Sequence, residues 1–266
     1  MAASRATEAM RPLTAVRSAL YLLFLAVTVI PYALAVLSWS WLPQTQRYWL
    51  VTGWPRTAVW GARWICGIRW RVEGWDNLPK GPTILMSKHQ SAWETLWLPA
   101  TMPCKLSFVY KRELHWVPFF GWAFATIGMI NIDRSKGQSA FEQVVEQGTS
   151  HLADGWWIVM FPEGTRTPPG STRRYKTGGA RLAVRTGTRV TPIALNSGEC
   201  WPRKAFLKKP GEITVSIGAP IPTAGRTDRE IAAIVESWIE TEMRRLAPHR
   251  YSEPYEPPSS DNSEGD

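Results

Sequence analysis

Hydrophobic and polar positions divide the chain into an apolar N-terminal part, a central part of alternating short strands and helices, and a polar end. Residues 19–37 contain no charged side chain and are long enough to span a bilayer. From residue 69 to residue 246, short runs typical of strands alternate with segments of helical periodicity. This alternation predicts an α/β domain with a largely buried mixed sheet flanked by helices.

The predicted strands of this domain are short and mostly apolar. They cover residues 69–73, 83–86, 107–110, 129–132, 156–161, 190–195 and 213–217. Helices are predicted over residues 94–98, 139–152, 178–186 and 228–246. The last helix has a capping box that begins at Thr227. Pro192 falls inside an apparent strand, which indicates a strand edge or a bulge because proline donates no ladder bond.

The apolar N-terminal run predicts contact with a membrane. It continues beyond Pro31, which makes a cleaved secretory signal the weaker interpretation. Three arginines before the run would keep the N-terminus in the cytoplasm, and a single span would then place the rest of the chain outside. A helix broken near Pro31, or one paired with the Trp-rich segment 48–68, would instead leave both ends on one side.

Segment 48–68 resembles an interfacial helix rather than a span, because it carries Arg56 and Arg63. We therefore expect a two-helix membrane anchor at residues 1–68. The main domain, residues 69–247, is then expected on the cytoplasmic face of the cell inner membrane.

Composition indicates an anionic, partly apolar partner. The chain has a net charge of +9 and 16 tryptophans, a residue type that favours the membrane–water interface. Nucleic acid is the weaker partner, because the basic residues are scattered and no zinc-finger spacing or RNP-like motif is present. The three cysteines lie far apart and suggest neither a disulfide framework nor a metal site. Residues 248–266 are rich in Pro, Ser and acids and are predicted to be disordered.

The sequence SKHQSAWE at residues 87–94 directly follows a predicted buried strand. Five helical steps would turn His89 and Glu94 toward different faces, so the two meet only if the histidine precedes the helix and the acid lies in its first turn. That geometry suits a general base held by a carboxylate. Ser91 and Glu94 also fit a capping box, which is a purely structural alternative.

Three further candidates lie at the ends of predicted strands, where open α/β sheets usually place their sites. The sequence GMINIDR ends at Arg134, which also fits an ordinary turn. The sequence FPEGTR brings Glu163 and Arg166 to the sheet edge, where they suit an anionic ligand or pair with each other. More cations follow on the same loop: Arg173, Arg174 and Lys176. The last candidate is VTPIA at residues 190–194.

These four blocks, in this order, resemble the glycerolipid acyltransferase family, in particular its bacterial 1-acylglycerol-3-phosphate acyltransferases. The resemblance covers about residues 70–220, and FPEGTR is its most specific part. Residues 111–114, 118–121 and 175–178 also resemble segments usual between the blocks. The sequence departs from the family pattern at Glu94, where aspartate is usual, and at Ser87-Lys88 before the histidine.

The resemblance implies acyl transfer from acyl-CoA or acyl-carrier protein to the sn-2 hydroxyl of 1-acylglycerol 3-phosphate. The product is phosphatidic acid, an intermediate of phospholipid biosynthesis. His89 would act as general base and Glu94 would orient it, with no acyl-enzyme, metal or other cofactor. The implied substrate-binding residues are Arg134, Glu163, Gly164 and Arg166, with Lys111 and Lys176 as weaker candidates.

Two alternatives stay open. The same chemistry could serve another acceptor, such as another lysophospholipid, a lyso-ornithine lipid or glycerol 3-phosphate. A non-catalytic membrane-binding protein is the other alternative, in which Glu94 only caps a helix. It predicts that a His89→Ala variant keeps all measured properties.

Overall fold

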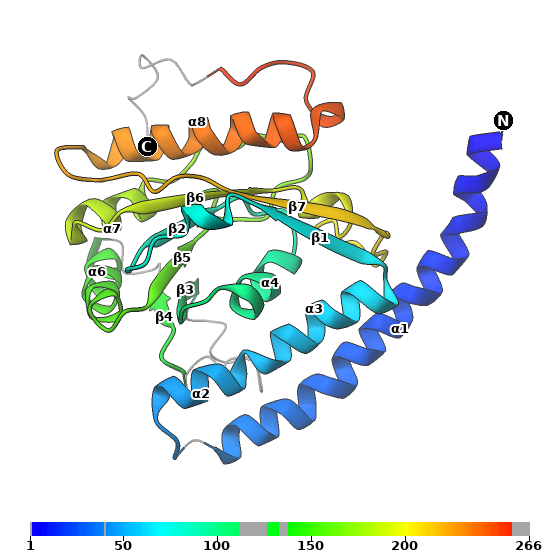
Figure 1. The fold of residues 1–266 in the computed structure, drawn as a ribbon, viewed down its shortest axis with the longest axis horizontal. Coiled ribbons are helices and arrows are strands. Elements are labelled where there is room, and N and C mark those ends of the chain that lie inside the picture. Colours follow the sequence, from blue (N-terminus) through cyan, green and yellow to red (C-terminus); the bar gives the residue numbers. More distant parts are fainter. Residues whose placement is uncertain (1, 40, 112–126, 133–137, 257–266) are drawn as a thin grey trace.

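The computed structural model describes residues 2–39, 41–111, 127–132 and 138–256 of the chain (Figure 1). Helices α1 (Ala2–Ser38), α2 (Gln44–Val51) and α3 (Gly53–Ile65) come first. The elements that follow are β1 (Ile68–Glu73), η1 (Trp75–Asn77), β2 (Ile84–Ser87), α4 (Trp93–Thr101), β3 (Leu106–Lys111), β4 (Ile130–Ile132), α6 (Gln138–Ala153), β5 (Trp157–Met160), α7 (Gly178–Thr186), β6 (Val190–Leu195), η4 (Ser197–Glu199), β7 (Gly211–Ile217), α8 (Asp228–Leu246) and η5 (Pro248–Arg250).

The described strands form one seven-stranded sheet in the order β1-β7-β6-β2-β5-β3-β4. Only the β6–β7 pair in this sheet is antiparallel. Helices α6, α7 and α8 lie on one side of the sheet, and α3 and α4 lie on the other, with α1 beyond α3 (Figure 1). The prediction of a mixed sheet flanked by helices is confirmed.

Strand β2 shows how sequence alternation builds the core on both faces of the sheet. Leu85 packs in the cluster that contains Trp93 and Trp97 of α4. Its neighbours Ile84 and Met86 pack in the other cluster, with residues of α7 and α8. Because both faces are covered, β2 and β6 are buried along their whole length, and their sequences are mostly apolar rather than alternating.

Pro192 lies in an interior strand rather than at a sheet edge. The antiparallel ladder between β6 and β7 covers only residues 193–195 of β6. Pro192 therefore lies just beyond the end of this ladder, and its carbonyl accepts a hydrogen bond from Gly218 N at 2.9 Å. The missing N–H is tolerated because β7 has already ended at Ile217.

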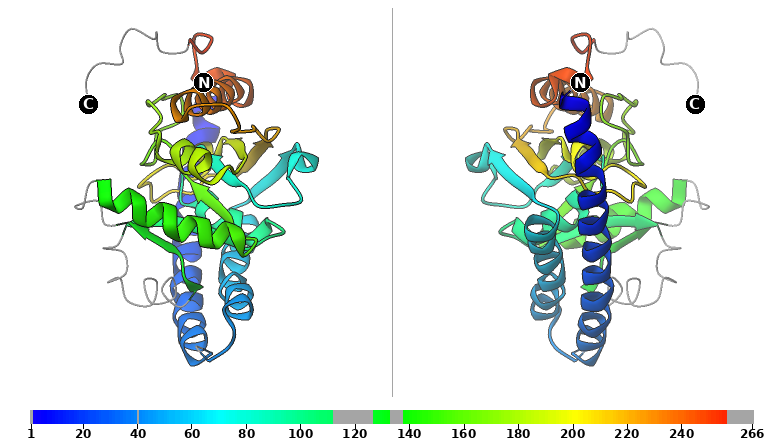
Figure 2. Two further views of the ribbon diagram at one scale, coloured as in Figure 1. Left: turned by 90° about the vertical axis from the view of Figure 1, so that its left-hand side faces the viewer. Right: turned by 90° about the vertical axis from the view of Figure 1, so that its right-hand side faces the viewer.

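Helix α1 packs along α3, as the pairing interpretation predicts, and α1 is not broken at Pro31. Figure 2 shows the two helices side by side. Tyr21 OH donates to Ala58 O at 3.0 Å, and a Cβ at Gly61 would lie 2.4 Å from the Phe24 ring. Glycine therefore permits the close approach of the helices. In the described part of the chain, one helical stretch, Pro12–Ser38, is long and apolar enough to cross a membrane.

The first residues of the predicted tail pack against the domain. Arg250 forms an ion pair with Glu199 at 2.7 Å, and Tyr255 OH donates to Glu236 at 2.9 Å. Residues 257–266 lie outside the described residues, so disorder of the tail stays a prediction for them.

Candidate active site

His89 lies in the turn between β2 and α4, as the spacing argument requires. Lys88 N still donates to Ile193 O of β6 at 2.9 Å, and the chain then leaves the sheet. Helix α4 begins at Trp93, so Glu94 lies in its first turn. The site is therefore at the carboxyl ends of the parallel strands β2 and β5.

The Glu94 carboxylate holds the His89 ring and the turn together. Its Oε1 lies 2.9 Å from His89 Nδ1 and accepts the backbone N–H groups of Gln90 and Ser91, each at 2.7 Å. Its Oε2 accepts the hydroxyl of Ser197 at 2.7 Å. One oxygen thus both caps the turn and contacts the histidine, so the structural and chemical interpretations of Glu94 are compatible.

The contact with Glu94 assigns the proton positions on the His89 ring. An ionised carboxylate only accepts, so Nδ1 carries the hydrogen and Nε2 carries the lone pair in the neutral ring. The ring also stacks on Phe161, with centroids 3.9 Å apart and an angle of 18° between the planes. The side chain of Glu94 is fully buried, while that of His89 is 12% exposed. This arrangement presents one basic nitrogen in a fixed direction.

The sequence FPEGTR forms a tight turn beside His89. Gly164 N donates to Phe161 O at 2.9 Å, and Gly164 has a φ of 68°. A Cβ at this glycine would lie 3.2 Å from Lys176 Cε, so both the backbone angle and the close lysine favour glycine.

The carboxylate of Glu163 points into the protein. Its Oε2 accepts His89 N–H at 2.8 Å, and its Oε1 contacts Lys88 Nζ at 2.7 Å and the Thr167 hydroxyl at 2.8 Å. Burial raises the pKa of Glu163, and the Lys88 ammonium opposes that effect. Because all of these contacts lie inside the protein, the Glu163 carboxylate supports the turn beside His89 from within.

The other predicted binding residues are described to different extents. Arg166 is partly exposed, and its carbonyl accepts from Arg203 Nη1 at 2.9 Å. Lys176 is exposed next to Gly164. Lys111 ends β3, but its side chain is outside the described part of the structure. Arg134 also lies outside the described residues. The substrate-binding roles of these residues stay predictions.

Comparison with known proteins decides the family. Residues 69–196 match the family model described as Acyltransferase. A relative from Pseudomonas aeruginosa, named 1-acyl-sn-glycerol-3-phosphate acyltransferase, is 40% identical over 244 residues, which are 90% of this chain and 95% of that protein. The chain belongs to the acyltransferase family.

Two more distant proteins are similar to this acyltransferase. Human 1-acyl-sn-glycerol-3-phosphate acyltransferase alpha is 30% identical over 178 residues, which are 65% of this chain and 62% of the human protein. The crystal structure of the 1-acyl-sn-glycerophosphate (LPA) acyltransferase from Thermotoga maritima superimposes with a TM-score of 0.73. It is 22% identical and covers 87% of this chain and 95% of the other, so it supports the fold.

Sequence reasoning gave no role in the candidate site to Ser197, Phe161 or Thr167. Ser197 is 103 residues from Glu94 in the sequence, and Thr167 N donates to His89 O at 2.8 Å from the far side of the FPEGTR turn. No local pattern marks such long-range partners. Phe161 could have been found, because it directly follows a predicted strand and precedes the Pro-Glu-Gly turn.

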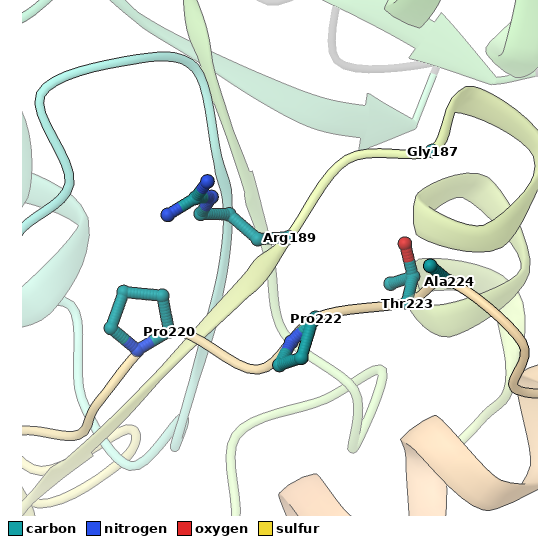
Figure 3. Close-up of a pocket in the computed structure, with 6 residues that line it drawn as sticks. All are labelled: Gly187, Arg189, Pro220, Pro222, Thr223 and Ala224. Carbon is teal, nitrogen blue, oxygen red and sulfur yellow. The ribbon is translucent and has the colours of Figure 1, made fainter.

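The structure also has a cavity away from His89, and Figure 3 shows the residues that line it. It has a volume of about 310 Å³ and is lined by Gly187, Arg189, Pro220, Pro222, Thr223 and Ala224. Arg189 precedes β6, whereas His89 follows β2, and the two strands are parallel. The cavity is therefore at the amino ends of these strands, and none of the described residues that line it is a histidine or an acid.

Proposed function

We propose that this acyltransferase transfers a fatty acyl group from acyl-CoA or acyl-carrier protein to the sn-2 hydroxyl of 1-acylglycerol 3-phosphate. Phosphatidic acid for phospholipid biosynthesis is the product. The observation that carries the proposal is the 2.9 Å contact between His89 Nδ1 and Glu94 beside the FPEGTR turn. The relatives named 1-acyl-sn-glycerol-3-phosphate acyltransferase support this choice of acceptor.

In the proposed reaction, His89 Nε2 takes the proton of the acceptor hydroxyl as its oxygen attacks the thioester carbonyl. The new C–O bond forms, and the C–S bond breaks when the tetrahedral intermediate collapses. The imidazolium then returns the proton to the departing thiolate. Glu94 stabilises the imidazolium and keeps its orientation. No serine or cysteine nucleophile is needed, so transfer is direct.

The cations after β5 form the proposed phosphate-binding side. The guanidinium of Arg166 matches a phosphate geometrically, and the exposed Lys176 lies beside the same turn. Gly164 lets the backbone approach closely there, and Glu163 supports the turn from inside. Lys111 and Arg134 remain proposed members of this side.

An Arg166→Ala variant is expected to raise KM for lysophosphatidic acid by ~10-fold or more while kcat changes less, because a binding contact is lost and the base remains. Steady-state kinetics in detergent micelles measure both constants. Arg226→Ala is the matched control, because Arg226 is exposed and donates to Pro222 O near the other end of the sheet. An unchanged KM would contradict the role of Arg166.

The function itself is tested with purified protein, labelled acyl-CoA and a set of acceptors. Lysophosphatidic acid should be acylated fastest, with lysophosphatidylcholine, lyso-ornithine lipid and glycerol 3-phosphate as competitors. A strong preference for an acceptor without phosphate would contradict the proposal. Replacing acyl-CoA by acyl-carrier protein in the same assay decides the donor.

We also propose that residues 1–68 anchor the protein to the inner membrane, with domain 69–247 on the cytoplasmic face. Several large apolar side chains of α1 are exposed, including Leu23 and Val27. Exposed Trp60 and Trp64 on α3 suit the membrane–water interface. Helix α3 has 13 residues and is about 20 Å long, which is too short for a span.

Contacts between the N-terminal helices and the domain favour an embedded anchor over a single span. Tyr21 of α1 packs edge-on against Trp201 with centroids 5.4 Å apart, and Gln44 of α2 donates to Ile127 O at 2.9 Å. Helices α1 and α2 are therefore held against the domain, which leaves the outer face of α1 for lipid. A C-terminal tag should be cleaved by protease in inverted inner-membrane vesicles and protected in spheroplasts, and the reverse result would contradict this orientation.

A further inference from the structure

Lys88 is a fully buried lysine that directly precedes His89. Its ammonium nitrogen lies 2.7 Å from Glu163 Oε1, 2.7 Å from Glu240 Oε1 and 3.3 Å from the carbonyl oxygen of Ser171. An ammonium group has three N–H donors, so each one has an acceptor within the protein. The side chain is inaccessible to solvent, and a direct contact with lipid or thioester is therefore excluded.

The acceptors of Lys88 come from separate segments of the chain. Glu163 lies in the FPEGTR turn, and Ser171 lies in the loop that follows. Glu240 belongs to α8 and is 152 residues from Lys88 in the sequence. Its Oε1 also accepts the hydroxyl of Tyr175 at 2.9 Å. The ammonium thus joins the turn after β2 to the loop after β5 and to α8.

Glu163 transmits this constraint to the backbone of His89. Its Oε2 accepts the N–H of His89 at 2.8 Å, while its Oε1 contacts Lys88 and the Thr167 hydroxyl. The N–H of Thr167 donates in turn to the carbonyl of His89 at 2.8 Å. The N–H and the C=O of His89 are therefore both held by the loop whose carboxylate contacts Lys88.

Charge balance explains why a cation is needed here. Burial tends to lower the pKa of Lys88, but the carboxylates of Glu163 and Glu240 keep it above its ordinary value. Lys88 therefore stays charged at neutral pH. Removing one partner of a buried ion pair leaves an uncompensated charge. Without the ammonium, the two carboxylates repel each other, and Glu163 has to protonate or move, which changes its contact with His89.

We propose that Lys88 is a positioning residue for acyl transfer, whose ammonium, held between Glu163 and Glu240, fixes the peptide groups of His89 and so the placement of the imidazole. The proposal rests on the proposed function, because it takes His89 as the general base. Lys88 acts through Glu163 and touches no substrate.

The test is steady-state kinetics of a Lys88→Met variant with lysophosphatidic acid and acyl-CoA. Methionine keeps much of the length and removes the charge. We expect kcat to fall by ~10-fold or more and KM for both substrates to change by less than ~3-fold, because the base is displaced while the binding groups remain. An unchanged kcat, or a loss confined to KM, overturns the proposal.

Lys208→Met is the matched control. Lys208 is also buried, but its ammonium donates to the carbonyl of Phe206 in a loop that packs on α1. The kcat of the Lys208→Met variant should stay within ~2-fold of the wild-type value, because no contact to His89 is lost. An equal fall of kcat in both variants would show a general effect of removing a buried lysine and would overturn the positioning role.

A double-mutant cycle separates positioning from folding. The Glu163→Gln substitution keeps an acceptor oxygen for His89 N–H, and the neutral side chain needs no cation beside it. We expect the variant Lys88→Met/Glu163→Gln to have a kcat within ~3-fold of Glu163→Gln alone, measured on protein shown to be folded by thermal unfolding. If the kcat losses of the two single variants instead multiply in the double variant, the proposal is overturned.

The proposed function and the role of Lys88 fail in different ways. A wild-type protein that is inactive on lysophosphatidic acid would contradict the proposed function. An active wild type with an equally active Lys88→Met variant would contradict only the role of Lys88.

Discussion

Replacing His89 by alanine is expected to lower the rate of acyl transfer to lysophosphatidic acid by ~10²- to 10⁴-fold, the usual contribution of a general base. The imidazole lies between Glu94 and Phe161, with one nitrogen paired to the carboxylate and the other left to take a proton. Alanine removes the base but leaves the turn, since the backbone contacts of residue 89 to Glu163 and Thr167 do not need the side chain. The measurement is the initial rate with labelled acyl-CoA at saturating acceptor.

His249→Ala is the control for this prediction. His249 is an exposed histidine near the C-terminus that lies 3.4 Å from Glu199, and its removal should leave the rate unchanged. Thermal unfolding of both variants shows whether the fold is kept. A folded His89→Ala protein that keeps the wild-type rate would contradict the role of His89 as general base. The alternative of a non-catalytic membrane-binding protein predicts instead that neither wild type nor the variant transfers an acyl group.

The order of elements could be predicted from the sequence because its signals are local. Alternation of the Ile84, Leu85 and Met86 side chains between two core clusters requires only a buried strand. The capping box of α8 was likewise predictable, with Glu230 N donating to Thr227 Oγ1 and Glu230 Oε2 accepting Thr227 N. These features depend on residues that are close in the chain.

The order of strands and the support of the site could not be predicted in the same way. Strand β7 lies between β1 and β6, and the residues of β7 alone do not indicate this position in the sheet. Ser197 reaches Glu94 only because β6 is beside β2, and Lys88 reaches Glu240 only because α8 crosses that part of the sheet. The pairing of His89 with Glu94 could be predicted, because a spacing of five residues limits the local structures in which the two side chains can meet.

Replacing Glu94 by glutamine is expected to lower kcat by ~10²-fold or more, by analogy with loss of the carboxylate that orients the histidine in serine proteases. Glutamine can keep one oxygen toward His89 Nδ1, Gln90 N and Ser91 N, so the turn is retained. It cannot stabilise the imidazolium with a negative charge. The expected signature is therefore an equal fall in kcat and kcat/KM, measured with lysophosphatidic acid.

A role limited to capping predicts a different result for the same variant. Because glutamine keeps the capping oxygen, the variant should then lose little stability, well under the roughly 1 kcal/mol of a lost cap, and should keep its kcat. Glu94→Asp then tests the length of the side chain. Oε1 meets three donors and Oε2 meets Ser197, and a carboxylate withdrawn by one methylene cannot keep all four contacts. We expect kcat of Glu94→Asp to lie between those of wild type and Glu94→Gln, and a wild-type value would show that the longer acid is incidental to the chemistry.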